Sequence, residues 1–295
     1  MAKVAVELER ALARRAEYGG AGCISSQLLA QGDGWTAEDV VCTSGPRDRA
    51  FEEQHSLVRV VIVAAGTFQY RCALGCELMT PGSVLLGNAG QFFECGHEHA
   101  AGDRCISFGY APEYFERLAR DAGGHQPHFG IARLPSIHAL SPTVARICAG
   151  LIAGDAEWEE LSIKLAAQAV QLSGGSPSPS ASPSAVARVT RAIRLIERHP
   201  DETLTLGILA EEARLSRYHF LRTFERLTGV TPHQYVLRTR LREAAMRLAT
   251  SRTRILDVAL ESGFGDASNF NRSFRGEFGV TPRVWKRAQA TADSC

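Results

Sequence analysis

Residues 259–287 read ALESGFGDASNFNRSFRGEFGVTPRVWKR, and much of this stretch repeats an earlier one. Phe220-Leu-Arg-Thr-Phe224 recurs as Phe270-Asn-Arg-Ser-Phe274, and Gly229-Val-Thr-Pro232 recurs as Gly279-Val-Thr-Pro282, both 50 residues further along the chain. Close self-similarity at a fixed spacing indicates two copies of one structural unit. The last hundred residues are therefore predicted to contain a duplicated unit.

Each copy is predicted to form a helix, a short turn and a second helix. The first copy places these helices at residues 205–213 and 216–227, each preceded by a Thr or Ser that can cap it. The second copy places the first helix at residues 255–263, with Gly263 suited to end it, and the second helix from Asp266 or Ser268 to about Phe278. The pattern is that of two helix-turn-helix units.

The second helix of each copy is predicted to bury one face and expose another. Phe220 and Phe224, like Phe270 and Phe274, are four residues apart and share a face that fills a core. The opposite faces carry groups that can bond base edges in a major groove. The predicted DNA-binding residues are Arg217, Tyr218, His219, Arg222, Thr223, Ser268, Asn269, Asn271, Arg272 and Arg275. A helix over 236–249 is expected to hold the units for successive major grooves, roughly 34 Å apart.

The charge of the chain is divided unevenly. Residues 185–295 contain 19 Lys and Arg against 12 Asp and Glu, a net charge of +7, whereas residues 1–184 carry −6. Eighteen of those 19 basic residues are arginines, whose planar guanidinium suits phosphates and guanine edges. The alternative is a plain helical bundle with solvated arginines. The repeat and the charge together favour a domain that binds nucleic acid.

Residues 188–288 resemble the AraC/XylS family of transcription regulators, with Ala259 to Arg287 as the matching signature. Trp285 takes the place of the aromatic residue that the family has near the end of the domain. The resemblance implies two helix-turn-helix units joined by a helix, double-stranded promoter DNA as a partner, and regulation that is mostly activation through RNA polymerase.

The sequence before the repeat predicts a second domain of a different class. Residues 55–110 contain short β-branched runs and frequent turns, which are typical of a small β-barrel or sandwich. Helices are expected at 112–122 and 141–172, either capping the barrel or pairing two subunits in a homodimer. Leu78-Met-Thr-Pro-Gly82 and the following SVLLGNAGQ resemble, more loosely, the cupin-like effector domain of many AraC/XylS members.

The domain organisation follows from the Ser, Gly and Pro-rich stretch SGGSPSPSASPS at 173–184, which is read as a linker. Residues 1–172 are then a cupin-like effector domain and residues 185–290 an AraC-type DNA-binding domain. The predicted fold class is α+β: an N-terminal β-barrel with helices and an all-α C-terminal domain. The effector is expected to be a small molecule or a metal.

A cysteine and histidine cluster is the sharpest chemical feature of the first domain. If residues 91–99 form a strand, Cys95, His97 and His99 point to the same side, and a turn at 100–103 brings Cys105 back beside His99. These four residues are the candidate metal ligands, with zinc as the candidate ion. The open alternatives are a redox sensor and a structural role, in which the thiols are small buried hydrophobes.

Composition and motifs exclude several function classes. With 45% hydrophobic and 22% charged residues the chain is typical of a globular protein, without a membrane segment or secretory signal, so we expect it in the cytoplasm. No catalytic residues are predicted, because a cupin enzyme needs an earlier His-x-His pair. The alternative function is an Ada-like DNA-repair regulator, suggested by Cys72 and Cys76 but lacking the Pro-Cys-His methyl-acceptor motif.

Overall fold

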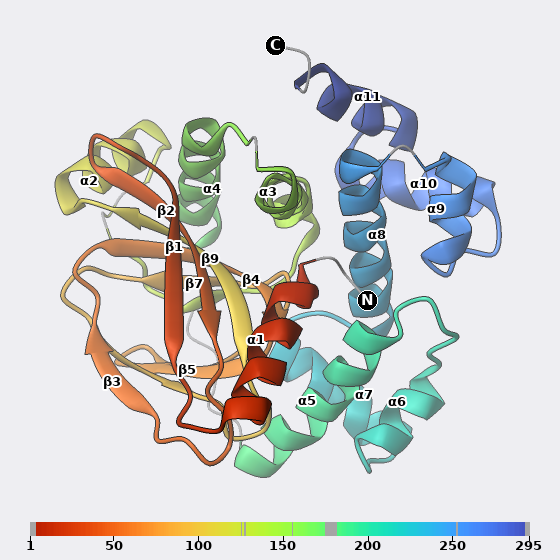
Figure 1. Cartoon of the computed structure of the whole chain (residues 1–295), viewed down its shortest axis with the longest axis horizontal. Coiled ribbons are helices and arrows are strands. Elements are labelled where there is room, and N and C mark those ends of the chain that lie inside the picture. The colour runs from red at the N-terminus through yellow and green to blue at the C-terminus, as the bar shows by residue number, and fades with distance from the viewer. Residues whose placement is uncertain are drawn as a thin grey trace.

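The computed structural model describes residues 4–124, 126, 128–154, 156–174, 182–251 and 253–292. Its first half is β-rich and its last third is all helical, with the helices α5 to α11 lying along one side of the β domain (Figure 1). This confirms the predicted α+β fold class. Within the described ranges, no helix combines the length and apolar character that spanning a membrane requires.

The β domain consists of two antiparallel sheets. The strands are β1 (Ile24–Gly32), β2 (Trp35–Cys42), β3 (Phe51–Gln54), β4 (Val58–Gly66), β5 (Phe68–Cys72), β6 (Gly75–Met79), β7 (Val84–Gly87), β8 (Phe92–Gly96), β9 (Asp103–Tyr110) and β10 (Arg133–Leu134). One sheet has the order β1-β2-β9-β4-β7-β10 and the other the order β3-β8-β5-β6. The hairpin β1–β2 was not foreseen from the sequence.

The six-stranded sheet is covered on both faces, which is why every residue of β9 is buried. Ile106 and Phe108 belong to the core shared with the helices, whereas Cys105 belongs to the smaller core between the sheets. Because neighbouring residues of a strand point to opposite faces, the odd-numbered positions of β9 face the second sheet. β9 is therefore the strand that carries side chains into the interior of the β domain.

Helices pack around the β domain (Figure 1). They are α1 (Ala5–Tyr18), α2 (Pro112–Asp121), α3 (Ser141–Ala153) and α4 (Trp158–Leu172), with a 3-10 turn at His138–Leu140 before α3. Leu161, Leu165 and Ala169 of α4 lie in the same core as the strands. The helices within residues 141–172 therefore cap the β domain, which is the first of the two roles expected from the sequence.

The C-terminal helices form two clusters around one long helix. They are α5 (Pro183–Arg198), α6 (Leu206–Glu212), α7 (Arg217–Thr228), α8 (Pro232–Thr250), α9 (Ile255–Glu261), α10 (Ala267–Phe278) and α11 (Pro282–Ala292). Tyr235 and Val236 of α8 lie in the core with α5, α6 and α7, whereas Leu241 and Leu248 lie in the core with α9, α10 and α11. One helix thus belongs to both units.

The predicted linker is described only at its ends, because residues 175–181 lie outside the described residues. α5 begins at Pro183, inside the stretch that was read as linker, with the Ser182 side chain accepting a hydrogen bond from the N–H of Ala185. Proline suits the first turn of a helix, where its missing N–H leaves no bond unmade. The helical part of the C-terminal region therefore starts earlier than residue 185.

The two regions share apolar cores. Leu78 of β6 packs into the core of α5, α6 and α7, Ala145 of α3 packs into that of α9 and α10, and Met246 of α8 packs into the core of the β domain. Contacts of this kind bury apolar surface that would otherwise face water. These apolar contacts hold α8 of the C-terminal region against α3 of the first region.

Candidate nucleic-acid interface and the cavity of the β domain

The first helix-turn-helix unit consists of α6 and α7. Thr205 and Ser216 cap these helices, each side chain accepting a hydrogen bond from a backbone N–H of the first turn. Arg214 takes a positive φ of 53° in the turn between them. Phe220 and Phe224 are fully buried, so the opposite face of α7 is left to solvent. The predicted caps and core residues are confirmed.

The second unit consists of α9 and α10. The Asp266 side chain accepts a 2.7 Å hydrogen bond from the N–H of Asn269 and caps α10. Gly263 ends α9 with φ of 79°, and a Cβ atom there would lie 2.6 Å from the carbonyl oxygen of Asp201. Only glycine meets both conditions. Phe270 is buried, as predicted for the repeat of the first unit.

All ten residues that were predicted to contact DNA belong to α7 or α10. Nine of them are exposed and Thr223 is half-buried. Arg222 lies over the ring of Tyr218, and Arg272 Nη2 is 3.4 Å from Asn269 Oδ1. These contacts join neighbours on one helix face and leave the outer side of the guanidinium groups open to a phosphate or base. The role of the ten residues in binding DNA stays a prediction.

α8 fixes the two units relative to each other. Its start is a capping box, in which the Thr231 side chain accepts from the N–H of Gln234 and the Gln234 side chain accepts from the N–H of Thr231. Near its other end, Trp285 Nε1 of α11 donates a 3.0 Å hydrogen bond to the carbonyl oxygen of Ala245. α7 and α10, the second or recognition helix of each unit, are therefore both packed against the single helix α8.

A segment of the first region, residues 133–141, contacts the C-terminal ends of both recognition helices. Arg133 donates to the carbonyl oxygen of the last residue of α7 at 3.1 Å, and His138 donates to a carbonyl oxygen near the end of α10. Ser141 contacts Glu277 of α10. No sequence pattern had pointed to this contact, because it joins residues 95 to 138 positions apart.

A cavity of about 400 Å³ lies between the two sheets. Cys42 of β2 is directly opposite Asp103 of β9, and Val40 is opposite Cys105, so these side chains share the inner face. The other sheet contributes Cys95 and residues at the ends of its strands. Its further polar lining consists of Ser26, Glu38, Glu53, Gln54, His55, Ser56, Arg59 and Ser107. The cavity is a candidate site for a small molecule.

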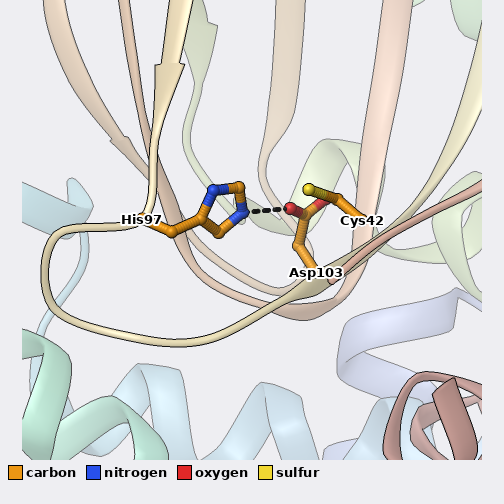
Figure 2. Close-up of side chains that lie close together, drawn as sticks. All are labelled: Cys42, His97 and Asp103. Carbon is orange, nitrogen blue, oxygen red and sulfur yellow. Dashed lines mark hydrogen bonds and ion pairs between the residues drawn. The ribbon is translucent and has the colours of Figure 1, made fainter. Parts of the chain in front are cut away.

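Cys42, His97 and Asp103 come together at one end of this cavity (Figure 2). The possible ligand atoms of the three side chains lie within 4.8 Å of one another, and all three residues are buried. His97 Nε2 donates to Asp103 Oδ2 at 2.6 Å, and Cys105 Sγ donates to Asp103 Oδ1 at 3.1 Å. The group contains a carboxylate, an imidazole and two thiols.

Burial and hydrogen bonding shift the acidities of this group. Burial alone would lower the pKa of His97, but hydrogen bonds with Asp103 and Cys42 outweigh it and raise that pKa to about 9. Burial, and then the neighbouring Asp103 carboxylate, raise the pKa of the Cys105 thiol well above its ordinary value. Without a bound cation the thiol of Cys105 is therefore neutral and the imidazole is protonated.

The predicted ligand set Cys95, His97, His99 and Cys105 is not brought together as such. β8 ends at Gly96, so strand alternation does not extend to His97 and His99. β8 and β9 also lie in different sheets, because residues 97–102 cross from one sheet to the other, so the expected hairpin that brought Cys105 beside His99 is wrong. Among the described residues, the one group with metal-ligand geometry retains His97 and adds two others.

The two added residues, Cys42 and Asp103, were missed by sequence reasoning. Cys42 ends a strand that was not foreseen, and Asp103 was read as part of a turn. The β-branched residues Thr36, Val40 and Val41 were a weak local signal of this strand, because residues 36–42 do not alternate between polar and apolar side chains.

Comparison with known proteins identifies the domain family of the C-terminal region. A helix-turn-helix domain family matches residues 209–288. The TetD protein of transposon Tn10 from Escherichia coli is 36% identical over 92 residues, which are 31% of this chain and 67% of TetD. The regulatory protein SoxS of Salmonella typhimurium is 33% identical over 94 residues, which are 32% of this chain and 88% of SoxS.

One solved structure is similar to about a third of the chain. A transcriptional regulator from Chromobacterium violaceum with an AraC-type DNA-binding domain is 29% identical, with a TM-score of 0.34 over 35% of this chain and 92% of that one. Other relatives at 33% identity are matched over only 29–32% of their own length. With a duplicated helix-turn-helix unit and an alignment that spans most of SoxS, this chain belongs to the AraC/XylS family of DNA-binding transcription regulators.

Proposed function

We propose that the chain is a one-component regulator, in which a signal bound by the β domain controls how the two helix-turn-helix units read promoter DNA. α7 and α10 enter successive major grooves, roughly 34 Å apart on one side of the duplex. The observation that carries this proposal is the exposure of Arg, Asn and Ser side chains on two recognition helices held by α8.

A path of direct contacts supports control by the β domain. Leu85 of β7 lines the cavity and is paired with Arg133 of β10. Arg133 Nε donates to Glu77 of β6 at 2.8 Å, and its Nη1 donates to the carbonyl oxygen of Thr228 at the end of α7. A ligand that moved β7 would therefore change a contact made by a recognition helix.

Further parts of the proposal concern the partners of the regulator. Family resemblance supports activation through contact with RNA polymerase, without enzymatic activity, in the cytoplasm where promoter DNA is found. α3 and α4 are used within the chain, so a homodimer would need another surface. β1 offers one, because it is an edge strand whose Ile24 and Leu28 side chains are 46% and 51% exposed.

The test uses the full chain and DNA selected with it from a random pool of double-stranded oligonucleotides. Binding to the selected sequence should be dominated by arginine–phosphate contacts. Its affinity should then fall about 1,000-fold or more between about 50 and about 200 mM salt. An affinity that does not change with salt, or a selection that enriches no sequence, would contradict the proposal.

The Ada-like alternative has no support in the described residues. Cys72 and Cys76 stand on either side of the β5–β6 turn, and Cys76 Sγ contacts Gln69 at 3.8 Å. No further Cys, His or acidic residue joins them in a group with metal-ligand geometry in the described part of the chain. A four-cysteine zinc site of the Ada type is therefore not proposed.

A further inference from the structure

The polar group at the end of the cavity is built by three separate segments. Cys42 is the last residue of β2, Asp103 is the first residue of β9 and His97 follows β8 in the opposite sheet. Their side chains converge from both sheets on one point (Figure 2). Such convergence has to be specified by the fold, since Cys42 lies 55 and 61 residues before the other two.

The backbone around Asp103 is held tightly in place. Gly66 of β4 has φ of 77°, and a Cβ atom there would lie 2.3 Å from the carbonyl oxygen of Gly102 and 2.7 Å from the Cα atom of Asp103. Gly102 itself has φ of 73°, and its own Cβ would lie 3.0 Å from the carbonyl oxygen of Cys42. Two glycines thus permit the close approach that places Asp103 beside Cys42.

Asp103 is a buried carboxylate that no arginine or lysine of the described residues neutralises. The side chains of His97 and Asp103 are only 2% and 8% exposed. Arg104, the next residue of β9, points to the other face and pairs with Asp39 at 2.7 Å. Among the described residues no Lys or Arg pairs with Asp103, which is bonded by His97 and the Cys105 thiol. The imidazole of His97 is thus the one positive partner of this buried carboxylate, and a cation bound between the two side chains would supply the same charge.

His97 has a second unusual feature. Its Nδ1 atom is buried and has no hydrogen-bond partner among the described residues. Buried polar atoms are nearly always satisfied in folded proteins. A ring that pivots to put a nitrogen on a metal, with the other nitrogen free to take a water or ligand atom, would remove this deficit.

We infer that Cys42, His97 and Asp103 bind one zinc-class divalent cation, with a fourth coordination position open to the cavity. Thiolate, imidazole and carboxylate are the ligands that Zn²⁺ takes in tetrahedral sites. All three residues line the cavity, so the open position faces the space where a small molecule would bind. Binding displaces the proton of the Cys42 thiol and the one between His97 and Asp103 to solvent.

A hydrogen-bonded cluster without metal is the competing explanation, and metal binding separates the two. The full chain, purified without a histidine tag or chelator and kept reduced, is analysed for metal content and titrated with Zn²⁺ against a chromophoric chelator. One zinc per chain is expected, and Co²⁺ in its place should show thiolate-to-metal charge-transfer absorption. Absence of both would overturn the inference.

Single substitutions test which side chains bind the metal ion. Cys42→Ser should weaken zinc binding at least about 100-fold and abolish the cobalt charge-transfer band, because it removes a thiolate ligand. Asp103→Asn should weaken binding while keeping that band. Cys72→Ser is the matched control, since Cys72 lies in the same domain outside the group, and it should bind as the unaltered chain does.

Two further readouts keep the result unambiguous. Each variant is checked for its circular dichroism spectrum and for binding to the selected oligonucleotide, so that an unfolded variant is recognised. Cys105→Ser should retain zinc and the charge-transfer band, because Cys105 is not among the three ligands. Unchanged zinc affinity in Cys42→Ser would overturn the site. Failure of DNA binding in the unaltered chain would instead contradict the proposed function and leave the metal result standing.

Discussion

Arg133 Nη1 donates a 3.1 Å hydrogen bond to the carbonyl oxygen of Thr228, and so ties the last strand of the β domain to the end of the first recognition helix. The same side chain pairs with Glu77 through Nε at 2.8 Å. Arg133 is 8% and Glu77 is 9% exposed, so both charges are buried in the contact between the two regions.

Removing Arg133 should therefore destabilise the protein. Arg133→Met leaves the Glu77 carboxylate buried without a partner, and we expect the free energy of unfolding to fall by about 3 kcal/mol. Urea denaturation of the full chain measures it. The double variant Arg133→Met, Glu77→Leu should regain most of the loss, because no charge is then left unpaired. A double variant as unstable as the single one would contradict this reading.

DNA recognition should depend on individual residues of α10. Arg272→Ala is expected to weaken binding to the selected oligonucleotide by about 1–3 kcal/mol and to relax discrimination at one base position. Fluorescence anisotropy with the selected sequence and its single-base variants measures both effects. Arg120→Ala serves as the charge-matched control, because Arg120 is exposed on α2, away from the recognition helices. Equal losses in the two variants would show a non-specific charge effect.

The glycine that ends α9 should not tolerate a side chain. Gly263→Ala forces a Cβ atom against the backbone of Asp201 at a positive φ, and we expect a loss of about 2 kcal/mol or more in stability. Gly276→Ala is the matched control, since no atom lies within 4 Å of a Cβ there and the position is helical. It should be neutral or stabilise by up to about 1 kcal/mol. Thermal unfolding of both variants tests the difference.

Stability should fall in mild acid because of His55. Burial, and then the charge of Arg59, lower the pKa of His55 from 6.5 to about 4, while the ring hydrogen-bonds Tyr70 at 2.9 Å and stacks on Phe93. Between these two pKa values the unfolded chain binds a proton that the folded chain does not. The folded state therefore loses stability as the pH falls from 6.5 to 4, by about 3 kcal/mol at most.

Urea denaturation at several pH values measures this loss. His55→Gln should make the same region of the profile flatter, because glutamine has no proton to gain. An equal slope in that variant would assign the acid sensitivity to other groups.

The duplicated helix-turn-helix region could be read directly from the sequence. Its helices are capped by Thr205, Ser216 and Asp266, and its cores use the repeated Phe pairs. Caps and apolar faces are local signals, the latter with a helical period. The strands β4, β5, β7, β8 and β9 were recognisable as well, from short β-branched or apolar runs bounded by turn residues. All these signals are local in the sequence.

The candidate metal group could not be read in this way. His97 was found because it lies in a conspicuous Cys-x-His-x-His stretch, but the partners assigned to it came from an assumed hairpin that the fold does not contain. Cys42 and Asp103 are 61 residues apart, and only the antiparallel register of β2 with β9 places them opposite each other. Strand order is set by packing across the whole domain, which no local pattern records.

The sequence by itself determined the family, the two DNA-reading units and their exposed basic faces, because these depend on helical periodicity and capping within each unit. Tertiary structure alone decided which side chains meet at the end of the cavity and that residues 133–141 touch both recognition helices. Those contacts join residues far apart in the chain. They exist only once two sheets and two helix clusters have packed against each other.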